Sequence, residues 1–210
     1  MLRRERGLAR TDELTGIENR RAFYELTDRE IRRAARYGKA FTVAYFDIDD
    51  FKLVNDRYGH DAGDAVLRVA ADTARKTIRA SDAVARLGGD EFAILLHETT
   101  AAASETVIRK LQRAIRDTVR VNGRAVTVSL GAVTCLEVPE TVDALLRSAD
   151  ELLYAAKRAG KNRARHRVLT SSPSGGCEGG IPLAAVWISP VDSRSRPLKL
   201  EGATSGTRSG

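Results

Sequence analysis

Residues 83–96 read AVARLGGDEFAILL, which is two apolar runs on either side of a Gly-Gly pair. A short glycine turn between β-prone runs is a strong hairpin signal, so we expect strands at 83–87 and 91–96. Asp90 and Glu91 directly follow the glycines and would lie at the tip of this hairpin. The stretch therefore predicts an antiparallel pair of strands with two carboxylates at one end.

A second acidic cluster ends another predicted strand. The apolar, β-branched and aromatic run FTVAYFDI at 41–48 is typical of a buried strand and leads into the acids of DIDD at 47–50. Such acids can simply cap turns, but crowded carboxylates at a buried strand end favour a cation, and oxygen ligands favour Mg²⁺ with a phosphate substrate. An antiparallel sheet could bring Asp47 beside Asp90, and the pair would then suit metal-assisted attack at phosphorus, with Glu91 as a weak proton acceptor.

Apolar periodicity along the rest of the chain predicts further helices and strands. Helices are expected at 19–37, 63–79, 101–119 and 142–156, and another strand is expected at 125–134. This order predicts an α/β (α+β) fold with a mixed, mainly antiparallel central sheet covered by helices. Residues 1–11 are interpreted as an N-terminal helical linker and 12–168 as one domain. Residues 169–210 are rich in Gly, Ser and Pro, so a disordered tail is expected there.

Composition narrows the class of protein. The 35 Lys and Arg residues exceed the 28 Asp and Glu residues, for a net charge of +7, but the basic residues are interspersed with acidic ones. This pattern favours solvated helix faces that attract a polyphosphate over nucleic-acid binding. Cys135 and Cys177 show no disulfide or metal spacing, and Cys135 is expected to be a small buried hydrophobe. The longest apolar run, 181–188, is far below the ~20 residues that span a bilayer, so we expect no membrane insertion and a cytoplasmic protein.

Several motifs follow one another in a fixed order along the chain. They are DELTGIENRR at 12–21, FDIDDFKLVNDRYGHDAGDAVL at 46–67, RLGGDEF at 86–92, ADELLYAAK at 149–157 and GKNR at 160–163. This series resembles the GGDEF family of diguanylate cyclases over almost all of the first 165 residues. The resemblance implies a fold similar to nucleotidyl cyclases and polymerase palm domains. It also implies an enzyme that condenses two GTP molecules into cyclic di-GMP and releases two pyrophosphates.

The resemblance assigns the metal site and the substrate site to particular residues. A Mg²⁺ or Mn²⁺ ion would be held by Asp47, the Ile48 carbonyl and Asp90, with Glu91 as a further catalytic carboxylate. The implied substrate-binding residues are Phe51, Lys52, Asn55, Asp64, Gly88, Gly89, Lys157 and Lys161. No catalytic or metal-binding role is expected for any histidine.

Guanine recognition would fall to Asn55 and Asp64. A guanine edge presents N1–H and N2–H₂ donors and an O6 acceptor, which suit a carboxylate and an amide, so Asp64 favours GTP over ATP. The alternative for both residues is a turn or helix-capping role. Lys157 and Lys161 would contact the γ-phosphate. Lys161 departs from the arginine expected there and would act as a point charge, with somewhat weaker phosphate binding.

A regulatory site is also implied by the motif Arg79-Ala80-Ser81-Asp82, which matches the RxxD product-inhibition site of the family. Arg79 would pair with a guanine or phosphate of cyclic di-GMP, and Asp82 with a guanine edge; an ordinary helix end is the alternative. The family implies a homodimer in which each domain holds one GTP, often joined to an upstream sensor, and no sensor is expected within these residues. Two other hypotheses are a domain that only senses GTP or cyclic di-GMP, and a different nucleotide cyclase or polymerase-like phosphoryl transferase.

Overall fold

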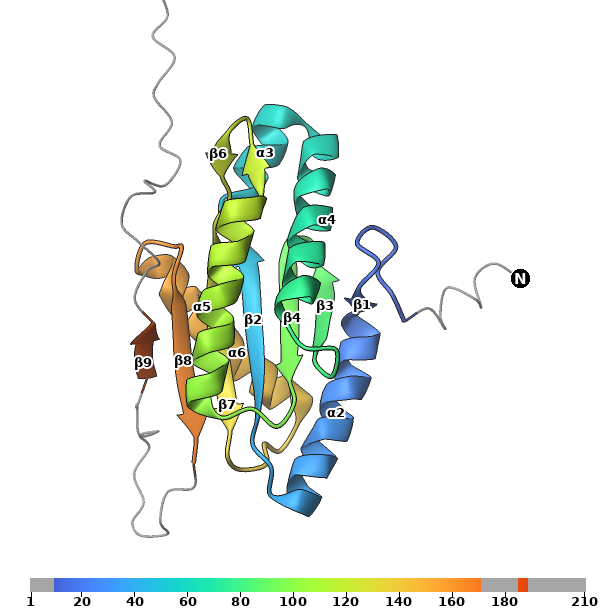
Figure 1. Ribbon diagram of the computed structural model, residues 1–210, viewed down its shortest axis with the longest axis vertical. Coiled ribbons are helices and arrows are strands. Elements are labelled where there is room, and N and C mark those ends of the chain that lie inside the picture. The colour runs from blue at the N-terminus through green and yellow to red at the C-terminus, as the bar shows by residue number, and fades with distance from the viewer. Residues whose placement is uncertain (1–9, 171–184, 189–210) are drawn as a thin grey trace, which may run out of the picture.

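The computed structural model describes residues 10–170 and 185–188 of the 210-residue chain. The strands are β1 (Glu18–Asn19), β2 (Phe41–Ile48), β3 (Ala83–Gly88), β4 (Glu91–Leu96), β5 (Arg120–Val121), β6 (Arg124–Ala125), β7 (Val128–Cys135), β8 (Ala164–Leu169) and β9 (Ala185–Ile188). Within the described residues, seven of them form one sheet in the order β1-β3-β4-β2-β7-β8-β9, and β5 pairs with β6 (Figure 1). Pairs β1–β3 and β7–β8 are parallel, and the other pairs are antiparallel. The predicted mixed, mainly antiparallel sheet is confirmed.

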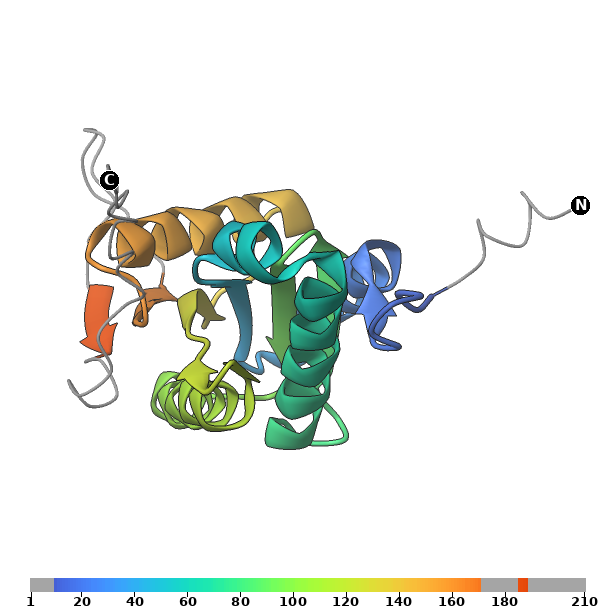
Figure 2. The same cartoon turned by 90° about the horizontal axis from the view of Figure 1, so that it is seen from above.

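Helices cover both faces of the sheet. They are α2 (Arg20–Tyr37), α3 (Phe51–Tyr58), α4 (His60–Thr77), α5 (Ala101–Thr118) and α6 (Val142–Arg158). Figure 2 shows α6 on one side of the sheet and α4 with α5 on the other. One core joins α2 and α6 to side chains such as Tyr45, and the other joins α4 and α5 to Phe46 and Phe92, whose rings stack 5.0 Å apart. Alternation along β2 thus sends successive side chains into two cores.

Local sequence signals define the ends of α2. The Asn19 side chain accepts a hydrogen bond from the Ala22 N–H at 3.0 Å, as expected of an N-cap. Gly38, at φ 64°, donates its N–H to the Ala34 carbonyl and closes the C-terminus. These caps agree closely with the expected helix at 19–37.

Among the described residues, the short strands β1, β5, β6 and β9, the helix α3 and the strand β8 were not expected from periodicity, and α4 begins earlier than expected. The helix α3 has Val54 as its sole buried residue, so no apolar stripe indicates it. The strand β8 contains two arginines and a histidine and is defined by its pairing with β7. The helix α4 begins at His60 rather than near residue 63, because Gly59 at φ 82° separates it from α3.

The terminal segments lie mainly outside the described residues. Most of the expected disordered tail at 169–210 is among them, but residues 185–188 form β9 against β8. An apolar run therefore pairs with an otherwise open sheet edge, which differs from the expected disorder at those residues. Of the expected linker at 1–11, residue Thr11 forms a β-bridge with Glu18 rather than a helix. Among the helices described, none has the length and apolarity to cross a bilayer.

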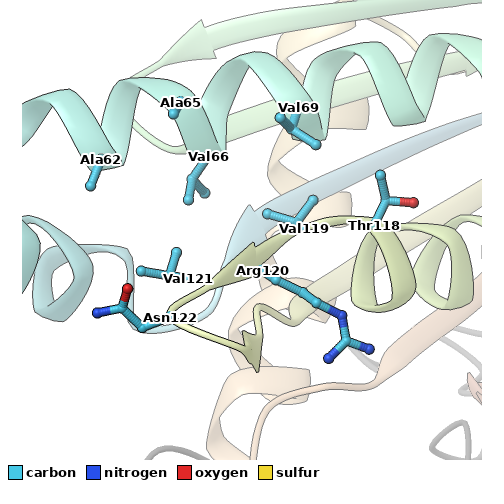
Figure 3. A pocket seen from close by; sticks show the side chains of 9 residues that line it. All are labelled: Ala62, Ala65, Val66, Val69, Thr118, Val119, Arg120, Val121 and Asn122. Atoms are coloured by element: carbon cyan, nitrogen blue, oxygen red, sulfur yellow. The ribbon is translucent and has the colours of Figure 1, made fainter.

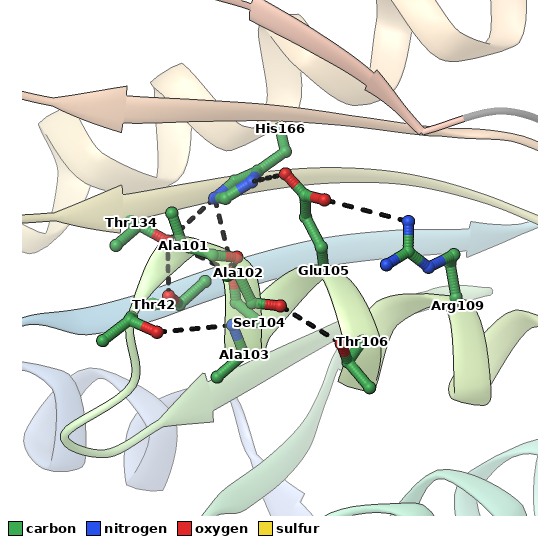
Figure 4. Close-up of polar contacts among 11 residues, drawn as sticks. Thr42, Ala101, Ala102, Ala103, Ser104, Glu105, Thr106, Arg109, Thr134 and His166 are labelled. Atoms are coloured by element: carbon green, nitrogen blue, oxygen red, sulfur yellow. Dashed lines mark hydrogen bonds and ion pairs between the residues drawn. The ribbon is translucent and has the colours of Figure 1, made fainter.

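A buried polar network lies between α5 and the sheet (Figure 4). His166 on β8 is 1% exposed, and its Nε2 lies 2.8 Å from the Thr134 hydroxyl, which lies 2.6 Å from the Thr42 hydroxyl. Its Nδ1 lies 3.6 Å from a Glu105 oxygen. Burial lowers the pKa of His166, although Glu105 opposes this effect. The network joins β2, β7, β8 and α5 through buried polar groups that hydrogen-bond to one another.

Candidate active site

Strand pairing brings the two acidic segments side by side. Asp47 at the end of β2 lies directly opposite Glu91 at the start of β4. The Ile48 N–H points to the Asp90 carbonyl at 3.4 Å, and Gly89 at φ 49° makes the turn that precedes Asp90. The four residues named as metal ligands or catalytic acids therefore gather at one end of the sheet.

The charge of Asp47 is the most perturbed of this group. Its carboxylate is largely buried, with 7% of the residue exposed. Burial raises the pKa of Asp47 to about 6, repulsion from Asp90 adds to the rise, and a hydrogen bond from Lys157 opposes it. An additional cation here would offset both the energetic cost of burying the Asp47 charge and its repulsion by Asp90.

The donor set fits a hard divalent ion. Asp47, Asp90 and the Ile48 carbonyl provide oxygen atoms alone, which Mg²⁺ prefers. Across residues 10–170 and 185–188, no group of three or more His, Cys, Asp or Glu side chains is gathered in metal-binding geometry. Mg²⁺ commonly uses one or two carboxylates and completes its shell with water and substrate phosphates, so this small set is sufficient.

Two lysines from the end of α6 and the loop after it face these acids. The Lys157 ammonium lies 2.8 Å from Asp47 Oδ2, and the Lys161 ammonium lies 2.6 Å from Asp50 Oδ1. The hydrogen bond to Asp50 raises the pKa of Lys161. Both cations are thus placed beside the acidic end of β2, where phosphate groups would replace part of their carboxylate contacts.

The residues expected to recognise guanine lie on α3 and α4. Asn55 packs closely on Gly63, because a Cβ at Gly63 would lie 1.9 Å from Asn55 Oδ1. Asp64 follows in the next position and lies 3.7 Å from Arg68. The helix start at His60 places Asp64 inside α4, so the N-cap alternative for this residue is wrong. Phe51 and Lys52 begin α3, where backbone N–H groups lack helical acceptors.

The RxxD segment lies at the opposite end of β3 from Gly88. The Arg79 N–H and the His97 N–H donate to the two Asp82 oxygens at 3.0 and 3.1 Å. The Asp82 N–H in turn donates to the Arg79 carbonyl at 3.0 Å. Asp82 therefore shapes a turn, and the pair is not part of the acidic cluster.

Sequence reasoning missed three polar residues at this end of the sheet. Tyr45 lies two residues before Asp47, on the same face of β2. Burial is the main cause that raises the pKa of its hydroxyl, and a hydrogen bond with Glu91 adds to the rise. Arg86 donates to the Gly89 carbonyl at 2.9 Å and pairs with Asp12 at 3.2 Å, which braces the hairpin turn. The spacing of two residues between Tyr45 and Asp47 on a strand could have indicated that both side chains lie on one face. No sequence pattern could have indicated the contact between Arg86 and Asp12, which lie 74 residues apart.

A cavity of about 260 Å³ lies between α4 and the β5–β6 ribbon and is lined mostly by apolar groups such as Val69 and Val121 (Figure 3). It contains none of the expected site residues. A second cavity of about 190 Å³ is lined by Arg20, Tyr45 and Asp150, among others, and lies beside the Glu91 end of β4.

The sheet is mixed and mainly antiparallel, with acids paired on neighbouring strands and helices on both faces. The family model described as "Diguanylate cyclase, GGDEF domain" matches residues 9–163. This chain belongs to that family.

The chain is also similar to individual curated proteins and solved structures. Diguanylate cyclase DgcP of Pseudomonas aeruginosa is 40% identical over 161 residues, which is 76% of this chain and 24% of DgcP. Cyclic di-GMP phosphodiesterase NbdA of the same organism is 34% identical over 162 residues, 76% of this chain and 21% of NbdA. The crystal structure of the GGDEF domain of DgcB from Caulobacter crescentus in complex with c-di-GMP has a TM-score of 0.71 and 32% identity, and the match covers 75% of this chain and 95% of that one. The chain spans about a quarter of the length of the curated relatives named here.

Proposed function

We propose that this domain is a diguanylate cyclase that joins two GTP molecules into cyclic di-GMP and releases two pyrophosphates. The observation that carries the proposal is the pairing of Asp47 with Glu91 beside Asp90, at a strand end that faces Lys157. Family membership and the relative DgcP, named a diguanylate cyclase, support the same reaction. GTP as substrate favours the cytoplasm as its location.

Asp47, Asp90 and the Ile48 carbonyl would hold Mg²⁺ or Mn²⁺. When bound, the ion supplies activation of a 3′-hydroxyl and neutralisation of the leaving pyrophosphate. The 3′-oxygen of one GTP forms a bond to the α-phosphorus of the other, the bond to pyrophosphate breaks, and the hydroxyl proton leaves. Glu91 lies at the site to accept that proton, and Tyr45 orients its carboxylate.

Substrate binding would divide between the two ends of this site. Asn55 and Asp64 would bind the guanine edge from α3 and α4. The amides of Phe51 and Lys52, the glycines of the hairpin turn (Gly88 and Gly89), and the ammonium groups of Lys157 and Lys161 would bind the phosphates. Since each domain holds one GTP, two copies must face each other for turnover, and Arg79 with Asp82 would bind the product as an inhibitor.

A second candidate function is nucleotide sensing without catalysis. It is motivated by NbdA, a relative named as a phosphodiesterase, in which the matching segment covers 21% of the protein. The complete set of acids in the present chain favours catalysis.

One assay separates the two functions. Purified protein is incubated with GTP and Mg²⁺, and the products are separated by chromatography, with ATP in place of GTP as a specificity control. We expect cyclic di-GMP from the wild type and none from the Asp90→Ala/Glu91→Ala variant. GTP binding without product over a wide range of protein concentration would support sensing instead.

A further inference from the structure

Asp49 lies among the acids at the end of β2, yet its carboxylate is bonded to the protein on both oxygens. The residue is 6% exposed. Its Oδ1 accepts a hydrogen bond from the Ser129 hydroxyl at 2.7 Å. Its Oδ2 accepts one from the Thr127 hydroxyl at 2.7 Å and one from the Asn162 backbone N–H at 2.9 Å. Three charge-assisted hydrogen bonds satisfy this carboxylate without a metal ion.

The segment that Asp49 binds has an uncommon backbone. Lys161 and Asn162 adopt φ values of 58° and 48°, in the left-handed region that residues with a Cβ rarely occupy. Such conformations persist where surrounding contacts hold them. The bond from the Asn162 N–H to Asp49 is a contact of this kind, and the preceding residue is Lys161, whose ammonium reaches Asp50 at 2.6 Å.

We propose that Asp49 is a positioning residue for the terminal phosphates of the substrate. It holds the left-handed loop at 160–162 in place, so that the Lys161 ammonium stays beside the acidic end of β2. Asp49 acts through Lys161 and is not a metal ligand. The inference rests on the proposed function, because the phosphates are those of GTP.

A conservative replacement separates this role from metal ligation. In Asp49→Asn, the remaining carbonyl oxygen can accept from Thr127 and Asn162, while the new amide donates to the Ser129 hydroxyl, which is also an acceptor. We expect this variant to keep Mg²⁺-dependent turnover within a few-fold of wild type, whereas Asp49→Ala loses about tenfold in GTP affinity. If Asp49→Asn lost as much Mg²⁺-dependent turnover as Asp47→Asn, the proposal would be overturned.

A double-mutant cycle tests whether Asp49 acts through Lys161. The probe is 3′-deoxy-GTP, which lacks the attacking hydroxyl, in the presence of Mg²⁺. Its binding is measured by calorimetry, and the binding of guanosine monophosphate is measured in the same way for comparison. Asp49→Ala and Lys161→Ala should each weaken 3′-deoxy-GTP binding about tenfold. The double variant should weaken it by about the same factor, because the effects of two residues that act through one contact do not add. Binding of guanosine monophosphate should stay within about twofold in all of them, since it lacks the terminal phosphates. Additive losses, or equal losses for both nucleotides, would contradict the inference.

Amide hydrogen exchange provides a readout that needs no nucleotide. In the full chain, Asp49→Ala should speed exchange at Asn162 and its neighbours, and Asp49→Asn should largely restore protection. If Asp49→Ala fails to fold, Thr127→Val removes one bond to Oδ2 at similar volume and should give a smaller effect in the same direction. Unchanged exchange at Asn162 overturns the role of Asp49 even if the protein makes cyclic di-GMP. Faster exchange in a protein that makes none overturns the proposed function and leaves the loop contact standing.

Discussion

At the scale of single residues, neighbouring acids with the same chemistry have different partners. Asp47 faces Lys157 and is repelled by Asp90. Asp49 accepts hydrogen bonds from Thr127, Ser129 and Asn162. Asp50 pairs with Lys161. β2 ends at Ile48, so Asp49 and Asp50 lie in the turn before α3, where Asp50 at φ 59° adopts a left-handed backbone. A motif of adjacent aspartates therefore contains carboxylates with separate partners.

Gly63 offers a sharp test of guanine recognition. A Cβ in Gly63→Ala would lie 1.9 Å from Asn55 Oδ1, and this flexible side chain can rotate away. We expect a stability loss of about 1 kcal/mol or less, with GTP affinity lowered about tenfold because the amide no longer faces guanine. Chemical denaturation and GTP titration measure the two effects.

The variant Gly63→Ala/Asn55→Ala is the matched control. It removes the clash and should recover stability without recovering GTP affinity. Recovery of affinity in the double variant would show that Asn55 does not bind guanine.

At the scale of elements, α5 and β8 are joined by a polar network rather than by apolar packing alone. His166 is buried against Thr134 and Ser104, and Glu105 is the facing acid, with Arg109 3.8 Å from it on α5. Neutral imidazole suits this environment because burial disfavours its charged form.

The stability of the fold should consequently depend on pH through His166. Its pKa is lowered in the folded state, so the unfolded state binds more protons as the pH falls. The contribution is complete above the unfolded pKa of about 6.5 and is lost as the pH falls through the lower folded value. The raised pKa of Asp47, about 6, acts in the opposite direction between pH 6 and pH 5 and does so in both proteins, so the test compares wild type with His166→Gln. Between pH 8 and pH 5, the denaturant midpoint of the wild type should fall relative to that of His166→Gln, and an equal slope in both proteins would exclude His166 as the cause.

At the scale of the whole molecule, the proposed catalytic and inhibitory sites occupy opposite ends of β3. Gly88 ends the strand beside the acids, whereas Asp82 precedes its first residue. A ligand at the RxxD turn would therefore act on turnover from a distance, through the strand or through the arrangement of two domains.

The proposed inhibition by product at the RxxD turn can be measured directly. Arg79→Ala should remove a charged contact to cyclic di-GMP and weaken inhibition about tenfold or more, with basal turnover unchanged. Rates are measured over a range of added cyclic di-GMP, with Lys76→Ala as a control for the loss of a nearby positive charge. Equal inhibition of Arg79→Ala and wild type would refute the assignment.

The proposed requirement for two copies predicts that turnover depends on protein concentration. Turnover per protomer should rise with protein concentration, because dimer formation follows mass action. Adding excess Asp90→Ala/Glu91→Ala protein to a fixed amount of wild type should lower cyclic di-GMP formation, since mixed pairs can complete at most one of the two bonds. Constant turnover per protomer and no effect of the variant would indicate catalysis by a single domain.

Sequence patterns alone were enough to predict the hairpin at residues 83–96, the strand at 41–48, the long helices and the class of sheet. Local turn chemistry and apolar periodicity carry these features, so they need no knowledge of distant contacts. The ordered motifs likewise indicated the family that the comparisons show.

The contacts of each acid, by contrast, depend on the tertiary structure. Asp49 is bonded to Thr127, Ser129 and Asn162, which lie 78, 80 and 113 residues away in the chain. The same holds for α3 and β8, which are held by α4 and β7 rather than by an apolar pattern of their own. Contacts between residues so distant in sequence leave no local signal, because packing of the whole sheet and its helices brings them together.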